Sequence, residues 1–184
     1  KQNGVDDLVA VADVHLEPLS LYSNKIGSLD ELKDGDTIAV PRDTTNYARA
    51  LYLLESAGLI EMDVPFDQAD LSVVTESNIT ANPKNLKFLA IERPQLARQL
   101  DDAQVTAAVI NSNYALEAGL TPAEDGIVTE QVDGNPFSNL LVVRAENEND
   151  PAVVALADAL ESPETAAWIE ETYSGSVVPV QPTN

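Results

Sequence analysis

The chain has 184 residues, 44% of them hydrophobic, with 31 acidic against 10 basic residues and a net charge of −21. This composition is that of a globular protein, long enough for one good core or two small lobes. The charge argues against nucleic acid or an anionic membrane surface as a partner. The lack of cysteine and the single histidine exclude thiolate chemistry and clusters of histidine metal ligands, so we expect no metal and no cofactor.

The N-terminal third begins with apolar runs that predict two strands, over residues 8–13 and 19–22, separated by a segment that Pro18 interrupts. A short capped helical turn is expected over 28–32. No apolar run approaches the length of a membrane span. The chain starts without an initiator methionine or a signal-peptide core, and we interpret it as a processed or truncated product.

The stretch 37–59 predicts a buried strand that feeds a helix through a polar turn. The strand residues 38–40 end at Pro41, the cluster 43–46 holds side chains that cap helices, and Gly58 supplies a stop. Asn46 and Arg49 are three residues apart and leave the same face of this helix. Because an arginine fork binds a carboxylate through two parallel hydrogen bonds, the pair is a candidate anion site. The alternative is a solvated arginine beside an asparagine of the cap.

Further along, the patterns predict strands over 87–91, 106–110 and 140–143, and helices or helical turns over 77–82, 95–100, 114–118, 151–160 and 163–173. Short apolar strands that alternate with helices indicate an α/β protein with mainly parallel sheets. Ligands in such folds lie at the carboxyl ends of strands. Asn46 and Arg49 follow one strand end and Asn111 follows another, which favours a pocket there.

Five segments together resemble a known family. They are VHLEPLSLYSNK, SLDELKDGDTIAVPRDTTNYARALYLLESAGLI, AAVINSNYALEAGL, NPFSNLLVVR and ALESPETAAWIEETYSGSVVP. In order and spacing they are similar to the methionine-uptake lipoproteins of bacterial ABC importers, the NlpA/MetQ family. The resemblance covers essentially the whole chain.

The resemblance implies a two-lobed periplasmic-binding-protein fold of type II. One lobe is expected from residues 1–35 and 126–184, and the other from 36–125. The protein is then expected to capture an amino acid, most often L-methionine, between its lobes and to deliver it to an ABC transporter permease. It implies an extracytoplasmic protein, periplasmic or at the cell surface, held by a lipid anchor outside this chain, and no enzymatic activity.

The same resemblance implies the ligand residues. The family's carboxylate-binding Asn and Arg fall on Asn46 and Arg49, and its polar contacts to the ligand backbone fall on Asn111 and Asn139. Candidates to line the ligand side chain are His15 and Tyr22. Without the family, His15 would be interpreted as a structural histidine, and the two strand-end asparagines as groups that satisfy turns.

Two departures from the family pattern lead to further expectations. Family members carry an N-terminal portion that supplies part of the first lobe, so we expect that lobe to be incomplete here and the truncated chain to self-associate through exposed apolar surface. Some relatives have an aromatic residue where Glu17 stands, which bears on the ligand side-chain pocket.

Three classes of function remain open at this point. The leading one is the transport receptor for methionine, another apolar amino acid or a methionine-containing dipeptide. A second is the ligand-sensing domain of a regulator, whose fold is similar. An enzyme is third, since the sequence has no phosphate loop and no nucleophile motif.

Overall fold

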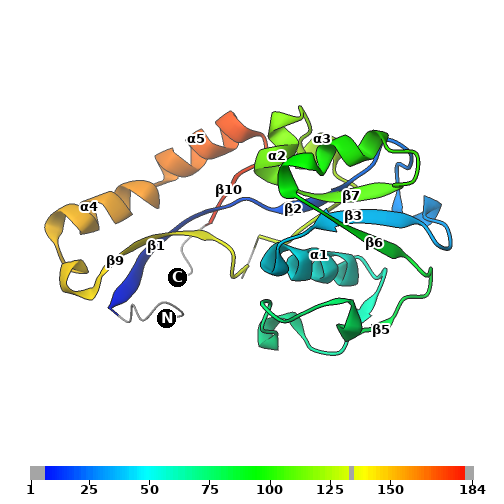
Figure 1. The fold of residues 1–184 in the computed structure, drawn as a ribbon. Coiled ribbons are helices and arrows are strands. Elements are labelled where there is room, and N and C mark those ends of the chain that lie inside the picture. Colours follow the sequence, from blue (N-terminus) through cyan, green and yellow to red (C-terminus); the bar gives the residue numbers. More distant parts are fainter. Residues whose placement is uncertain (1–6, 133–134, 181–184) are drawn as a thin grey trace. The chain divides into compact units, whose positions relative to one another are not determined.

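A computed structural model of the chain describes residues 7–132 and 135–180. The chain divides into two compact units: unit 1 is Lys1–Pro18 with Gln131–Asn184, and unit 2 is Leu19–Glu130. Unit 2 is one continuous segment inserted between the two segments of unit 1. The elements of both are drawn in Figure 1.

Unit 2 is built on a five-stranded sheet in the order β6-β3-β7-β2-β8. The strands are β2 (Leu19–Tyr22), β3 (Thr37–Pro41), β6 (Lys87–Ile91), β7 (Ala107–Asn111) and β8 (Val128–Thr129). β3 runs parallel to β6 and β7, but β2 runs antiparallel to β7 and β8. Four of the five strands therefore point the same way, as expected for a mainly parallel sheet, and β2 runs against them. The expectation is wrong for the sheet of unit 1, whose pairings are antiparallel. Strands buried on both faces carry the same apolar run in either direction, so the run did not reveal the direction of β2.

The helices of unit 2 cover both faces of this sheet. They are α1 (Thr44–Ser56), α2 (Ser112–Glu117) and α3 (Pro122–Asp125), with the 3-10 helices η1 (Leu29–Glu31), η2 (Phe66–Gln68), η3 (Glu76–Asn78), η4 (Arg93–Gln95) and η5 (Ala97–Asp101). α1 lies on one face and α2 on the other (Figure 1). α1 ends at Gly58, whose φ of 72° is the left-handed geometry of a helix stop. The predicted central strand and helix are confirmed.

A second, two-stranded sheet in unit 2 pairs β4 (Glu61–Met62) with β5 (Ile79–Ala81). The helical turn predicted over 77–82 is correct only at its start, where η3 lies. β5 follows η3, because pairing with the distant β4 determines the extended backbone conformation of residues 79–81. No local sequence pattern predicts such a pairing.

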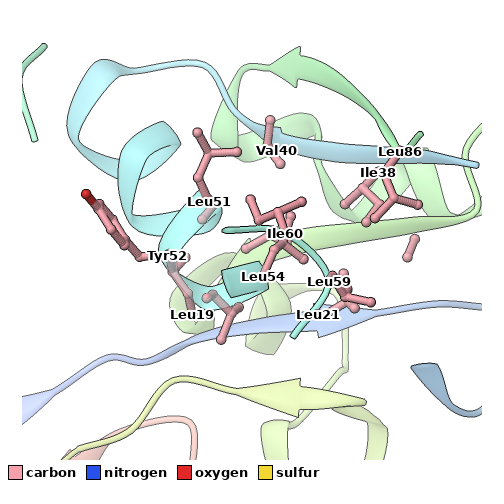
Figure 2. Close-up of a cluster of buried hydrophobic side chains, with 14 of the residues drawn as sticks. Leu19, Leu21, Ile38, Val40, Leu51, Tyr52, Leu54, Leu59, Ile60 and Leu86 are labelled. Carbon is pink, nitrogen blue, oxygen red and sulfur yellow. The ribbon is translucent and has the colours of Figure 1, made fainter. Parts of the chain in front are cut away.

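The core of unit 2 consists of two clusters, one on each face of the large sheet. The first packs α1 against alternate residues of β2 and β3 (Figure 2). Its labelled members are Leu19, Leu21, Ile38, Val40, Leu51, Tyr52, Leu54, Leu59, Ile60 and Leu86. The second cluster holds the strand residues of opposite parity, Tyr22, Ala39, Ala108 and Ile110, under η5 and α2. Period-2 alternation thus gives the sheet two apolar faces.

Unit 1 is a three-stranded antiparallel sheet in the order β10-β1-β9 with two helices. Its elements are β1 (Leu8–Leu16), β9 (Asn139–Arg144), η6 (Ala145–Asn147), α4 (Pro151–Leu160), α5 (Pro163–Tyr173) and β10 (Val178–Pro179). Both helices begin as predicted, because Asp150 and Ser162 cap them and a proline occupies the first turn.

The boundary between the units differs from the expected one. Residues 19–35 and 126–130 were expected in the first lobe but belong to unit 2. The reason is hydrogen bonding. β2 and β8 are strands of the large sheet, and the described strands that form the unit 1 sheet all lie before Leu19 or after Glu130.

Candidate functional site

The site begins at the N-terminus of α1, where Asp43 caps the helix. Its Oδ1 accepts the backbone N–H of Asn46 at 3.2 Å and also the Nδ2 of the same residue at 2.8 Å. Its Oδ2 lies 3.2 Å from Nε of Arg93. Both carboxylate oxygens are thus engaged, one by the helix start and one by a neighbouring cation. Asp43, rather than Asn46, is the capping residue.

Asn46 connects this cap to the end of β7. Its Oδ1 accepts a hydrogen bond of 2.9 Å from Nδ2 of Asn111. Asn111 is 7% exposed, and its Oδ1 is buried without a hydrogen-bond partner in the part of the chain that the structure describes. A buried acceptor without a donor costs about 1–3 kcal/mol and calls for an explanation. The structure thus brings Asn46 and Asn111 together, and the ligand pocket expected there stays a prediction.

Arg49 lies one turn further along α1 and pairs with Glu130. Its Nε donates to Oε1 at 2.8 Å and its Nη2 to Oε2 at 2.5 Å, the bidentate fork of an arginine with a carboxylate. The side chains are only 8% and 11% exposed. Oε2 also accepts the backbone N–H of Leu19 at 3.1 Å. Arg49 is therefore a buried residue in an ion pair, not a solvated one.

Glu130, the last residue of unit 2, is held in place by hydrogen bonds to the first residues of the same unit. Its backbone N–H donates to the carbonyl of Leu19 at 2.9 Å, and the preceding Thr129 hydrogen-bonds Ser20 through the side chains at 2.9 Å. Sequence reasoning missed Glu130. It is one of 31 acidic residues and follows a two-residue strand, so no local pattern distinguishes it.

Tyr22 is not brought to this group of residues. Leu19 and Leu21 of β2 face α1, so alternation turns Tyr22 to the opposite face, where it is 1% exposed in the second cluster. Its hydroxyl has no hydrogen-bond partner among the described residues. Burial raises the pKa of Tyr22 to about 12. Tyr22 borders a separate hollow of about 280 Å³ with Leu100, Leu120 and other residues.

His15 and Asn139 both belong to unit 1, where they are opposite each other in the register of β1 and β9. His15 Nε2 lies 3.7 Å from Oε1 of Glu17, and the two side chains are 28% and 41% exposed. The strand pairing is irregular between Asp13 and His15. The structure thus brings these two candidates together within their own unit.

Residues 7–132 and 135–180 contain no group of three or more His, Cys, Asp or Glu side chains placed to hold a metal ion. Within the same ranges, no helix has the length and apolar character needed to cross a membrane.

Comparisons with known proteins match nearly the whole chain. The family model described as NlpA lipoprotein matches residues 1–181. The D-methionine-binding lipoprotein MetQ of Salmonella typhi is 45% identical over 171 residues, which are 93% of this chain and 61% of that protein. The chain thus spans about 61% of the length of this relative.

Two solved structures are also similar. An ABC transporter periplasmic substrate-binding protein from Coxiella burnetii is 37% identical with a TM-score of 0.80, and the match covers 97% of this chain and 72% of that one. A nutrient binding protein from Burkholderia cenocepacia, bound to methionine, has the same identity, TM-score and coverage. These likenesses confirm the expected α/β fold of the periplasmic-binding-protein kind.

Proposed function

This chain belongs to the NlpA lipoprotein family, and from that premise we propose that it is the substrate-binding protein of an ABC importer. Its ligand is an amino acid, for which methionine is the leading candidate, and its partner is the transporter permease. The protein acts outside the cytoplasm, attached to a membrane through a lipid anchor that is not part of the 184 residues.

The names of similar proteins support the ligand class. The Salmonella typhi relative is a D-methionine-binding lipoprotein, and the Burkholderia cenocepacia structure is bound to methionine. The Coxiella burnetii structure is that of an ABC transporter substrate-binding protein. All three are described as binding proteins, and we propose that this chain is a binding protein rather than an enzyme.

The chemistry of the unit 2 site supports an amino acid as ligand. A zwitterion needs a cation for its carboxylate and hydrogen-bond acceptors for its ammonium group. Arg49 is a buried guanidinium, and charge-assisted bonds to a carboxylate are among the strongest that side chains make. We propose that the ligand carboxylate binds Arg49 alongside Glu130, which hydrogen bonds to Leu19 hold in place.

The observation that carries the proposal is the buried Oδ1 of Asn111. An ammonium group donates three hydrogen bonds and accepts none. A ligand ammonium would give this oxygen the donor that it lacks among residues 7–132 and 135–180, and the free energy lost at an unsatisfied acceptor would be recovered on binding. We therefore assign Asn111 to the ammonium group, with Asn46 as its support.

His15 and Asn139 of unit 1 stay predictions from the family resemblance. Their measurable consequence is ligand preference: His15→Ala should change the ratio of affinities among apolar amino acids more than Arg49→Ala does, because the arginine interacts with a group that all amino acids share.

Isothermal titration calorimetry of the 184-residue chain tests the proposal. The ligands are L-methionine, D-methionine, L-leucine and methionylglycine, with methionine methyl ester as the control that lacks the carboxylate. We expect saturable binding of a methionine form and much weaker binding of the ester. A chain that binds none of the free amino acids and no dipeptide would overturn the proposal.

A further inference from the structure

We propose that Asp43 sets the direction of a chain of side-chain amides and thereby makes the site selective for a protonated amine. This inference rests on the proposed function. It concerns a residue that lies two hydrogen bonds away from the proposed ammonium site and is assigned here as a positioning residue. The chain of groups runs from Asp43 through Asn46 to Asn111.

The first link is fixed by charge. A carboxylate only accepts hydrogen bonds, whereas an asparagine amide presents either its oxygen or its NH2 group to a neighbour. Asp43 Oδ1 already accepts the backbone N–H of Asn46, and its Oδ2 faces Arg93. The amide of Asn46 must therefore turn its NH2 group toward Asp43, as the 2.8 Å contact to Nδ2 has it.

The second link follows from the first. With its NH2 group on Asp43, Asn46 presents its oxygen to Asn111, which must donate through Nδ2, at 2.9 Å. The remaining end of the Asn111 amide is then Oδ1, a buried acceptor. If the direction of the chain were reversed, the buried end would be an NH2 group, which repels an ammonium group.

Neighbouring residues hold Asp43 itself in place. Arg93, its ion-pair partner, lies over the ring of Tyr114 with 5.9 Å from Cζ to the ring centroid. The cap on α1 fixes Asp43 from the other side. The direction of the amide chain is thus set outside the ligand site, and it is present before any ligand arrives.

The test compares two ligands, L-methionine and 4-(methylsulfanyl)butanoate, which is methionine without its amino group. The test variant is Asp43→Ser, because serine still caps the helix but is too short to hold the Asn46 amide. We expect the affinity for methionine to fall by about tenfold, at the low end for a hydrogen bond to a charged group. The affinity for the desamino analogue should stay within about twofold of wild type, since the ordering of the amide does not affect its carboxylate.

Two matched variants separate the possible causes. Asp43→Asn should keep the preference for methionine that the serine variant loses. The backbone N–H and the Nδ2 of Asn46 would both still donate to the amide oxygen of the new side chain. Arg93→Gln, which removes the ion pair and the contact with the Tyr114 ring but keeps the Asp43 carboxylate and its bonds to Asn46, should change the preference little. Asp43→Thr is the second capping variant, should the serine variant not fold.

An equal loss for both ligands in the serine variant would mean that Asp43 acts only through α1, and would overturn the inference. Unchanged affinity for both ligands would overturn it too. If the wild-type chain binds neither ligand, the proposed function is overturned, and the role of Asp43 with it.

Discussion

Unit 2 and unit 1 bury their apolar side chains to very different degrees. Both hydrophobic clusters formed by the described buried residues lie in unit 2, around a sheet covered on its two faces. Unit 1 buries few apolar side chains and exposes large ones on its strands and helices, including Leu8, Leu140, Val142, Val154, Leu156 and Trp168. The free energy of folding should therefore come mainly from unit 2. Unit 1, a three-stranded sheet with two helices, should contribute less.

The largest expected effect is at the ion pair of unit 2. Arg49→Ala leaves the Glu130 carboxylate buried without its partner, so we expect the free energy of unfolding to fall by about 3–5 kcal/mol. Methionine affinity should fall by about 2–5 kcal/mol as well. Urea unfolding and calorimetric titration measure the two effects.

Arg42→Ala is the matched control, because Arg42 pairs with Glu92 at 3.4 Å but its side chain is 68% exposed. It should cost at most about 1 kcal/mol. The double variant Arg49→Ala/Glu130→Gln should recover part of the lost stability but none of the lost affinity. An Arg49→Ala chain that binds methionine as wild type does would contradict the assignment.

A pair of leucines tests the comparison of the units directly. Leu51 is fully buried in unit 2, and Leu156 of unit 1 is 49% exposed. Leu51→Ala should lower the free energy of unfolding by about 2–5 kcal/mol, from lost burial and the cavity left behind. Leu156→Ala should change it by less than about 0.5 kcal/mol. Comparable losses in urea unfolding would show that unit 1 has a core of its own.

Tyr22→Phe should stabilise unit 2 by about 1 kcal/mol at pH 8, since it removes a buried hydroxyl that has no hydrogen-bond partner among the described residues. The pKa of Tyr22 in the folded chain is about 12, above its ordinary value of about 10. The associated stability is therefore fully present below pH 10 and is lost as the pH rises toward 12. Between pH 8 and pH 11 the variant should lose about 1 kcal/mol less than wild type.

Methionine affinity should be unchanged in Tyr22→Phe, because Tyr22 lies on the sheet face away from α1. A drop in affinity for methionine would restore Tyr22 as a ligand residue, as the family resemblance implies.

The smallest effect on stability is expected at Trp168 in unit 1. This side chain is 56% exposed and meets Tyr173 edge to face, with 5.8 Å between ring centroids. Trp168→Ser should change the free energy of unfolding by less than about 0.5 kcal/mol. It should reduce self-association at high protein concentration, measured by light scattering, since exposed apolar patches drive such contacts. A wild-type chain that stays monomeric there would contradict this expectation.

Local signals predicted those parts of the fold that local chemistry determines. α1, α4 and α5 begin at capping residues and follow apolar periodicity, and they lie where predicted. β4, β8 and β10 have two residues each and exist only because a distant strand pairs with them. No local window carries that information, and the antiparallel direction of β2 was hidden for the same reason.

The site divides in a similar way. Asn46 and Asn111 were expected near two strand ends of one sheet, and the structure joins them by a hydrogen bond. Glu130 could not be found, because its role depends on the folding of β8 beside β2, which brings it to Arg49. The charge of Asp43 was visible in the sequence, but its effect on two amides downstream required the hydrogen bonds themselves.

The adjacency of Leu19 and Glu130 has a consequence for engineering. The first and last residues of unit 2 are joined by backbone and side-chain hydrogen bonds, so the two ends of the segment 19–130 lie next to each other. Segments whose ends meet in this way can be transplanted into a loop of another protein. Glu130 is also the ion-pair partner of Arg49. A ligand that binds Arg49 would therefore change the interactions of Glu130, the residue at which the segment ends. Under the proposed function, residues 19–130 are therefore a candidate segment for a ligand reporter whose signal arises at the junction.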